Sequence, residues 1–253
     1  MNEVTLEKMK QMKFYGMHNA FKTAIETGRT DGYTIDEFIS LLIDSEHDDR
    51  QTRKINRHIT NARFRYSAEL EKVSYSEERN LHKNKVMRLA DCSYIKKGEN
   101  ILITGSTGVG KSFLASALGH HACSMGYRVL YFNTSKMFAK MKMAKVDASY
   151  IKSTAHVERQ NLVILDDFGL QPMDNQSRMI LMDIVEDRHE KSSMIITSQL
   201  PVDSWYDVIG EKTMADAIMD RIVHNSHRID LKGESMRRTK PKNNPQENIK
   251  INN

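Results

Sequence analysis

Residues 105–112 read GSTGVGKS, which matches the pattern G-x-x-x-x-G-K-[ST] at every fixed position. The three glycines let the backbone curl so that successive N–H groups point inward at phosphate oxygens. The apolar run NILIT at 100–104 precedes this loop, and a helical pattern from about 111 to 125 follows it. Because strand, loop and helix occur in this order, the stretch predicts a phosphate-binding loop at a helix N-terminus.

Short apolar segments recur after this loop, with helical patterns between them. The expected strands are 100–104, 128–132, 162–166, 194–198 and 227–231, and the expected helices are about 111–125, 134–145, 174–190 and 213–224. This alternation predicts an α/β fold with a parallel central sheet flanked by helices. Near-continuous apolar strands suit a sheet that is buried on both sides.

Two carboxylates, Asp166 and Asp167, end the apolar strand at 162–165. Ligands of open α/β sheets bind at this carboxyl edge of the strands. We expect Asp166 to hold Mg²⁺, and Asp167 to polarise the attacking water as a general base. Adjacent residues of a strand point to opposite faces, which favours separate roles for the two. Without the phosphate loop, the pair would indicate only an acidic turn after a core strand.

The loop supplies the other expected contacts of a nucleotide. Lys111 is expected to contact the β- and γ-phosphates, and Ser112 is expected to ligate Mg²⁺. The predicted cofactors are therefore ATP and Mg²⁺. The full set of expected nucleotide contacts is Gly105, Ser106, Thr107, Gly108, Val109, Gly110, Lys111, Ser112, Phe113 and Asp166.

Residues 1–98 are expected to form a small all-helical domain. Thr34 and Glu37 have the spacing of a capping box, and a long helix is expected from about 48 to 70. The domain 99–238 carries the phosphate loop, and Gly98 is a candidate hinge before it. The tail 239–253 is basic, with two prolines and few apolar residues, and is expected to be disordered.

A cluster of basic residues between 50 and 66 contains no acidic residue. Most of its members fall on one helical face, which predicts contact with DNA phosphates. The alternative is a solvated face that pairs with the acidic run at 44–49. Basic residues after the second strand offer another candidate DNA surface. The predicted DNA-binding residues are Arg50, Arg53, Lys54, Arg57, Arg63, Arg65, Lys140 and Lys142.

The composition excludes several classes of protein. Two cysteines in 253 residues rule out a disulfide framework. The chain starts without an apolar signal segment and has no apolar run that is long enough to span a membrane, so we expect a cytoplasmic location and no membrane partner. The net charge of +5 permits a nucleic-acid partner. The excess lies outside 99–238, where basic and acidic residues balance.

The chain resembles the IstB family of insertion-sequence transposition helpers, and more broadly the DnaC-like branch of AAA+ ATPases. The resemblance covers nearly the whole chain, and its N-terminal stretches are more specific than the phosphate loop, which many unrelated NTPases share. The stretches that carry it are GMHNAF (16–21), DDRQTRKINRHITNARFRYSAELE (48–71), GSTGVGKSFLASALG (105–119), LVILDDFGLQPM (162–173) and IITSQLPVDSW (195–205).

The resemblance implies an AAA+ ATPase that forms an ATP-dependent homo-oligomer on duplex DNA and assists a transposase. It also implies further catalytic residues beside Lys111 and Asp167. Ser198, within 197–199, resembles the sensor of the γ-phosphate. Arg221 resembles the arginine finger that reaches a neighbouring subunit, and Arg237 resembles the second sensor arginine. Most AAA+ proteins carry Glu at the place of Asp167, so hydrolysis is expected to be slow or partner-dependent.

Three other functions stay open at this point. A DnaC-like loader of a replicative helicase would share the ATPase core, and only the N-terminal domain separates it from a transposition helper. A small-molecule kinase would use the same loop, but it usually needs an Arg-rich lid, and no such Arg cluster follows the acidic strand. A binding module that uses ATP only as a structural switch is the third.

Overall fold

The computed structural model describes residues 2–28 and 32–236. Arg237 and the tail 239–253 therefore lie outside the described residues. The chain divides into two compact units, Met1–Asn61 and Ala62–Asn253. This division falls well before the expected domain boundary at residue 98.

The N-terminal unit consists of α1 (Asn2–Gln11), α2 (Tyr15–Thr27) and most of α3 (Ile35–Ala62). The predicted capping box is confirmed at the start of α3. The Thr34 N–H donates to Glu37 Oε2 at 2.8 Å, and the Glu37 N–H donates to Thr34 Oγ1 at 3.3 Å. The hydrogen bonds from Thr34 lower the pKa of Glu37. Two orphan N–H groups at this helix end are thus satisfied reciprocally.

Gly16 and Glu46 hold α2 against α3. A Cβ on Gly16 would lie 2.2 Å from the backbone oxygen of Ser45, so only glycine permits this approach. Glu46 is 6% exposed, and its Oε2 accepts the N–H groups of Gly16 at 2.8 Å and Met17 at 3.3 Å. A carboxylate thus caps the first turn of α2, where the helix dipole favours negative charge.

The long helix predicted over 48–70 is wrong at both ends, because α3 begins at Ile35 and ends at Ala62. Arg63 has φ +57°, a left-handed conformation that stops the helix. The following residues instead belong to the second unit, in which Ala62 and Ala68 are fully buried. Tertiary packing therefore overrides the helical pattern of this stretch. Between 63 and 98 only short elements form: η1 (Leu70–Lys72), α4 (Lys83–Leu89) and α5 (Ser93–Lys97).

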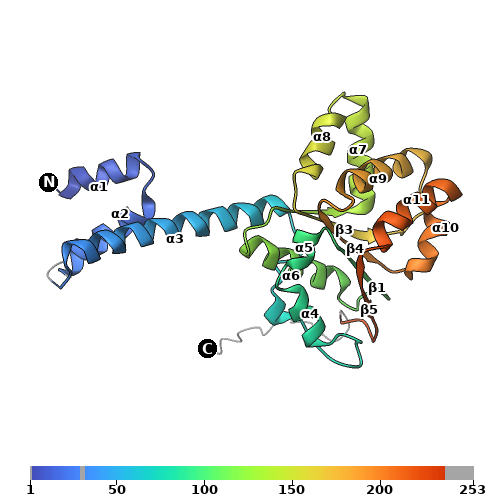
Figure 1. Cartoon of the computed structure of the whole chain (residues 1–253), viewed down its shortest axis with the longest axis horizontal. Helices are drawn as coiled ribbons and strands as arrows, with labels where there is room; N and C mark the ends of the chain where they lie inside the picture. Colours follow the sequence, from blue (N-terminus) through green and yellow to red (C-terminus); the bar gives the residue numbers. More distant parts are fainter. Residues whose placement is uncertain (1, 29–31, 237–253) are drawn as a thin grey trace, which may run out of the picture. The chain divides into compact units, whose positions relative to one another are not determined.

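The second unit is built on a five-stranded sheet with every neighbouring pair parallel (Figure 1). The strand order is β2-β3-β4-β1-β5. The strands are β1 (Asn100–Gly105), β2 (Val129–Asn133), β3 (Leu162–Phe168), β4 (Ser193–Ser198) and β5 (Ser226–Leu231). The predicted parallel sheet is confirmed, and β1 and β4 lie between the other strands, so the phosphate loop leaves from near the middle of the sheet.

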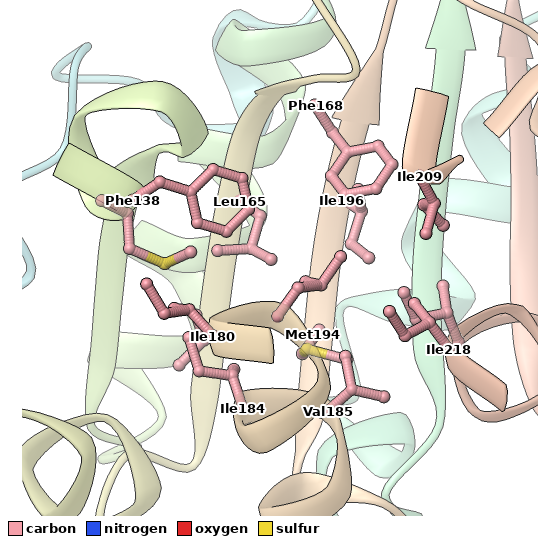
Figure 2. Packing of buried hydrophobic residues seen from close by; sticks show 14 of the residues in the cluster. Phe138, Leu165, Phe168, Ile180, Ile184, Val185, Met194, Ile196, Ile209 and Ile218 are labelled. Atoms are coloured by element: carbon pink, nitrogen blue, oxygen red, sulfur yellow. The ribbon is translucent and has the colours of Figure 1, made fainter. Parts of the chain in front are cut away.

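Helices cover both faces of this sheet (Figure 1). On one face lies α6 (Lys111–Ser124), whose Gly119 faces Ile164 of β3. On the other face the strands and helices share one apolar core (Figure 2). Phe168 and Trp205 pack in this core with their ring centroids 4.7 Å apart. The elements of that face are α7 (Thr134–Val146), α8 (Tyr150–Glu158), α9 (Asn175–Arg188), η2 (Val202–Ser204), α10 (Trp205–Ile209) and α11 (Lys212–Val223).

No helix within residues 2–28 and 32–236 combines the length and the apolar character that crossing a bilayer requires.

Candidate nucleotide-binding site

The phosphate loop runs from the last residue of β1, Gly105, to the first residue of α6, Lys111. Gly105 has φ +140°, and a Cβ there would lie 2.2 Å from the backbone oxygen of Leu231. Gly108 has φ +87°, and a Cβ there would lie 2.1 Å from Ser235 Oγ. Both positions therefore require glycine for conformation and for space.

Lys111 carries its charge inside this loop. The side chain is buried, and Nζ donates to the carbonyl oxygens of Gly105 at 2.8 Å and Ser106 at 2.9 Å. An ammonium held at the N-terminus of α6 adds to the positive end of the helix dipole. A positive charge at a helix N-terminus favours the binding of an anionic phosphate.

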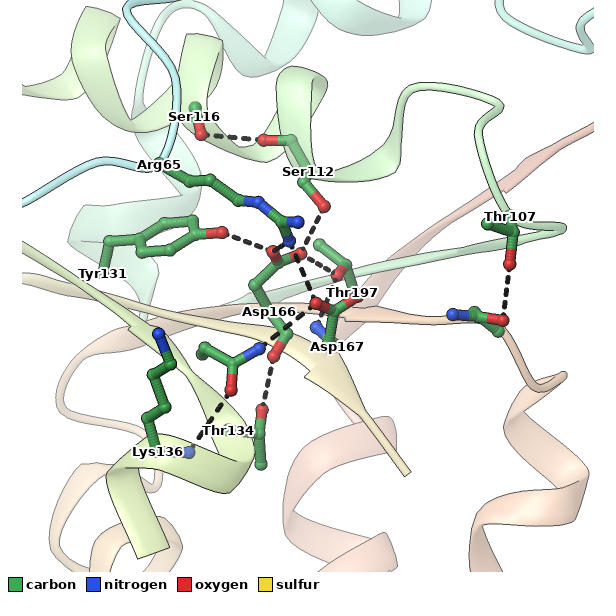
Figure 3. Close-up of polar contacts among 12 residues, drawn as sticks. Arg65, Thr107, Ser112, Ser116, Tyr131, Thr134, Lys136, Asp166, Asp167 and Thr197 are labelled. Atoms are coloured by element: carbon green, nitrogen blue, oxygen red, sulfur yellow. Dashed lines mark hydrogen bonds and ion pairs between the residues drawn. The ribbon is translucent and has the colours of Figure 1, made fainter. Parts of the chain in front are cut away.

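Asp166, on β3, is fully buried and accepts hydrogen bonds from four side chains (Figure 3). Ser112 Oγ donates to Oδ1 at 2.8 Å, and the hydroxyl of Thr197 donates to the same oxygen. The hydroxyl of Tyr131 donates to Oδ2, and Arg65 Nη1 donates to Oδ2 at 3.2 Å. Burial, together with the bond to Asp166, raises the pKa of Tyr131 well above its usual value. The carboxylate is therefore held in one orientation beside the loop.

Asp167 points to the same side as Asp166, which corrects the expectation that strand alternation separates them. The register of β3 and β4 shifts between Leu165 and Phe168, so that two residues of β3 face one of β4. Such a bulge bends the strand and re-aims its side chains. Asp167 has φ +58°, and its Oδ2 accepts from Arg65 Nη1 at 3.0 Å and Asn133 Nδ2 at 3.2 Å.

Arg65 belongs to this site rather than to the face of a helix. Its guanidinium lies within 3.2 Å of both carboxylates, about one hundred residues along the chain. The sequence indicated only a basic residue within a basic cluster, because a contact of this range leaves no periodic signal. Phe64 beside it faces α6, where a Cβ on Gly119 would lie 2.6 Å from the Phe64 ring.

The three polar residues at the end of β4 have different surroundings. Thr197 contacts the acidic pair, since its hydroxyl donates to Asp166 and accepts the Asp167 N–H at 3.2 Å. Gln199 Oε1 accepts from Thr107 of the loop at 2.7 Å (Figure 3). The hydroxyl of Ser198 instead donates to the Phe168 carbonyl at 2.8 Å. The structure thus brings Thr197 and Gln199, and not Ser198, to the residues expected to bind nucleotide.

Arg79 is a further residue at the loop that the sequence did not reveal. Its Nη2 donates to the Val109 carbonyl, and its own carbonyl accepts the Lys232 N–H at 3.1 Å. Burial lowers its pKa. The Met236 N–H donates to the Gly108 carbonyl at 3.0 Å. Segments before β1 and after β5 therefore brace the loop from outside.

Two further predicted site residues, Phe113 and Arg221, contact other helices or segments of the same unit. Phe113 is half-buried on α6, with its ring centroid 6.2 Å from that of Tyr66. Arg221, near the end of α11, forms an ion pair with Glu186 at 2.6 Å and donates to the Ala217 carbonyl at 3.0 Å. Arg237 lies outside the described residues.

Half of the predicted DNA-binding residues form ion pairs within their own unit. Arg50 pairs with Glu46 at 2.7 Å, and Arg53 pairs with Asp49 at 2.7 Å, as the alternative of an acidic partner run implied. Lys142 pairs with Asp174, which lowers the pKa of that carboxylate, and Arg65 lies at the acidic pair. Within the part of the chain that the structure describes, four have no ion-pair partner: Lys54, Arg57, Arg63 and Lys140.

The donor set beside the loop suits magnesium. The Ser112 hydroxyl and the Asp166 carboxylate are hard oxygen ligands 2.8 Å apart. Mg²⁺ is usually held by one or two such groups together with substrate phosphates and water. In the described ranges no group of three His, Cys, Asp or Glu side chains is placed to hold a metal ion.

Comparison with solved structures identifies the fold of the second unit. A crystal structure of DnaI aligns with a TM-score of 0.58 and 21% identity, covering 66% of this chain and 92% of that chain. The crystal structure of the DnaC helicase loader aligns with a TM-score of 0.58 and 20% identity, covering 66% of this chain and 98% of that chain. The parallel sheet with its phosphate loop therefore has the AAA+ phosphate-loop NTPase fold.

Comparison of sequences identifies the family. The relative y4pL of Sinorhizobium fredii, called a putative insertion sequence ATP-binding protein, is 43% identical over 92% of this chain and 96% of its own. The putative ATP-binding protein of insertion sequence IS21 from Pseudomonas aeruginosa is 28% identical over 93% of this chain and 88% of its own. The profile of the family described as IstB-like ATP binding protein matches residues 7–244. The chain is therefore a member of the IstB-like ATP-binding proteins.

Proposed function

We propose that this protein hydrolyses ATP with Mg²⁺, assembles as a homo-oligomer on duplex DNA and assists the transposase of its insertion sequence. One observation carries the enzymatic part of the proposal. Lys111, Ser112, Asp166 and Asp167 converge at the carboxyl edge of β1 and β3, with Ser112 Oγ 2.8 Å from Asp166. The family, whose relatives are named for insertion sequences, supports the rest.

Each residue of the site has a separate task in hydrolysis. Lys111 binds phosphate oxygens, and Ser112 with Asp166 holds Mg²⁺, which when bound neutralises the charge of the phosphates. Asp167, oriented by Asn133 at 3.2 Å, accepts a proton from the attacking water. Thr197 fixes the backbone of Asp167 and takes the place at the end of β4 that we first expected Ser198 to fill.

We assign the contact with DNA to exposed basic residues that have no acidic partner. Lys54 and Arg57 are exposed on α3, and Lys140 is exposed on α7. Phosphate contacts of this kind need charge and carry no sequence information. Arg221 is proposed to act in a neighbouring subunit's site, which requires that it leave Glu186. ATP-dependent assembly would supply the partner subunit for that exchange.

The proposal is tested by ATP turnover and by DNA binding in the same preparations. We expect Lys111→Ala to abolish both ATP turnover and ATP-dependent retention of duplex DNA. Asp167→Asn should retain ATP-dependent DNA binding and lose turnover by about a hundredfold or more, as is typical for loss of a general base. Lys191→Ala, an exposed lysine away from the loop, is the charge-matched control. DNA binding by Lys111→Ala that equals wild type with ATP would refute the proposal.

Assembly is tested by imaging the protein with ATP, Mg²⁺ and duplex DNA. A filament, ring or spiral on DNA that is absent in Lys111→Ala supports the proposal. Discrete monomers under every condition contradict it. Because Arg221→Ala leaves the intramolecular loop intact, we expect it to bind nucleotide normally and to lose turnover in the assembled state.

A helicase loader is the second candidate, because the second unit has the fold of DnaI and DnaC. Those structures cover 66% of this chain, whereas the insertion-sequence relative covers 92% and so includes the N-terminal unit. That extra coverage favours the transposition role. Binding of the purified protein to a replicative helicase, with no binding to the transposase of the same element, would reverse the choice.

A further inference from the structure

Arg65 connects the two carboxylates of the candidate site through one nitrogen. Its Nη1 lies 3.2 Å from Asp166 Oδ2 and 3.0 Å from Asp167 Oδ2 (Figure 3). Of the four side chains that donate to Asp166, three are neutral hydroxyls, and Arg65 carries the charge. The guanidinium therefore supplies a positive charge at the place where the family's chemistry requires a divalent cation.

The acceptor positions of Asp166 are fully used. A carboxylate offers about four lone-pair sites, and here each oxygen accepts two hydrogen bonds. A cation that engages this carboxylate must therefore displace a donor. Tyr131 and Thr197 are buried, and Ser112 is itself an expected magnesium ligand. The side chain of Arg65 is 41% exposed and also repels a second cation. Arg65 is thus the donor that leaves.

The residues on either side of Arg65 are held on the helix that begins with the phosphate loop. Phe64 faces Gly119 of α6, and its ring centroid lies 6.4 Å from that of Tyr131. The ring of Tyr66 lies 6.2 Å from that of Phe113 on the same helix. Arg65 also follows the last residue of α3, Ala62, by only three positions. It therefore lies near the start of the second unit, four residues after the last residue of the N-terminal unit, Asn61.

We propose that Arg65 competes with magnesium for Asp166 and Asp167, and that binding of ATP with Mg²⁺ displaces it. Its release loosens residues 63–66, so that the link between α3 and the ATPase unit responds to the nucleotide. This inference rests on the proposed function, because it assigns magnesium-bound ATP to the same site.

The first test measures how much Mg²⁺ is needed for binding of a fluorescent ATP analogue, followed by anisotropy. Arg65→Met should lower the half-maximal Mg²⁺ concentration by about tenfold, which corresponds to about 1.4 kcal/mol. Arg65→Lys should lie between Arg65→Met and wild type, because lysine keeps a positive charge but its ammonium is more strongly hydrated than a guanidinium. Arg159→Met is the matched control, since Arg159 is exposed, and should equal wild type.

The second test compares two conditions in the wild-type protein and then in Arg65→Met. Hydrogen–deuterium exchange of residues 63–66 in the wild-type protein should be faster with ATP and Mg²⁺ than with ATP and a chelator. In Arg65→Met the two conditions should give the same exchange.

The outcomes separate the two ideas. If wild type binds the analogue in a Mg²⁺-dependent way but folded Arg65→Met behaves like Arg159→Met, the competition is refuted and the proposed function stands. Exchange of residues 63–66 that ignores Mg²⁺ in wild type refutes the release. If wild type binds no analogue with or without Mg²⁺, the proposed function itself fails.

Discussion

Thr197 donates its hydroxyl hydrogen to the buried carboxylate of Asp166, which belongs to the neighbouring strand β3. The Thr197 Oγ1 atom also accepts a hydrogen bond from the backbone N–H of Asp167 at 3.2 Å. A hydroxyl can donate once and accept in addition, so one side chain orients the carboxylate and fixes the bulge that aims Asp167. Residues of β4 therefore set the geometry of the acidic end of β3.

Replacing Thr197 by Val should impair hydrolysis more than nucleotide binding. The methyl group keeps the packing but leaves Asp166 and the Asp167 N–H without their shared partner, which costs about 1–3 kcal/mol. We expect at least a tenfold loss of ATP turnover and a small change in affinity for ATP. Thr197→Ser should retain activity, because it keeps the hydroxyl.

Ser198→Ala is the neighbouring control for that experiment. The Ser198 hydroxyl donates to the Phe168 carbonyl, so its loss should lower the free energy of unfolding by about 1 kcal/mol and leave turnover nearly unchanged. Turnover that falls more in Ser198→Ala than in Thr197→Val would show that the sensor is Ser198, as the resemblance suggested.

Gly108→Ala should abolish ATP binding while the protein stays folded. The new methyl group would meet Ser235 Oγ at 2.1 Å, and the φ of +87° disfavours any residue with a Cβ. Gly126→Ala is the control, because Gly126 has φ +90° and nothing within 4 Å of the added carbon. It should cost only the backbone strain of about 1–2 kcal/mol and bind ATP normally in an anisotropy titration.

Arg188→Met should strongly destabilise the second unit. Arg188 is 1% exposed and donates to the carbonyls of Val157, Gln160 and Ser193, at 2.9, 3.1 and 2.7 Å. Burial lowers its pKa to about 10. The variant leaves these buried acceptors unpaired, so the free energy of unfolding should fall by about 3 kcal/mol or more in a urea titration. Exposed Arg159→Met should fall within about 0.5 kcal/mol of wild type.

Glu46→Gln should make the N-terminal unit less stable in a way that depends on pH. Burial of Glu46 opposes its ionisation, but hydrogen bonds from Arg50, Met17 and Gly16 outweigh burial and lower its pKa. A lowered pKa contributes stability above the ordinary value of 4.5, and this contribution disappears as the pH falls through the lower value. The difference from wild type should be about 1–2 kcal/mol at pH 7 and vanish at low pH.

Circular dichroism of the full chain during thermal unfolding measures this difference at pH 7 and at pH 3. Glu26→Gln is a suitable control, because Glu26 forms only an exposed pair with Lys22. A Glu46→Gln deficit that persists unchanged at pH 3 would contradict the role of the charge.

Local patterns predicted the parts of this protein that depend on neighbours in sequence. The capping box at Thr34 and Glu37, the phosphate loop and the buried strands all follow from residue types at fixed short spacings. The predicted C-terminal end of the long helix was wrong because the apolar and basic periodicity of the sequence continues through 63–70, where the structure has no α-helix. Packing of Phe64 and Ala68 within the second unit decides the conformation of that segment, and sequence periodicity does not report such packing.

The sequence by itself determined the α/β class, the phosphate loop and the acidic strand end, because glycine conformations, strand burial and helix periodicity are short-range properties. Only the tertiary structure decided which polar groups meet. It brings Arg65 within ion-pair distance of both Asp166 and Asp167, and it brings the hydroxyl of Thr197, and not that of Ser198, to Asp166. It also turns the two adjacent aspartates to one side of the strand. These outcomes depend on strand order and on a one-residue bulge, and a single register shift moves every side chain to the other face.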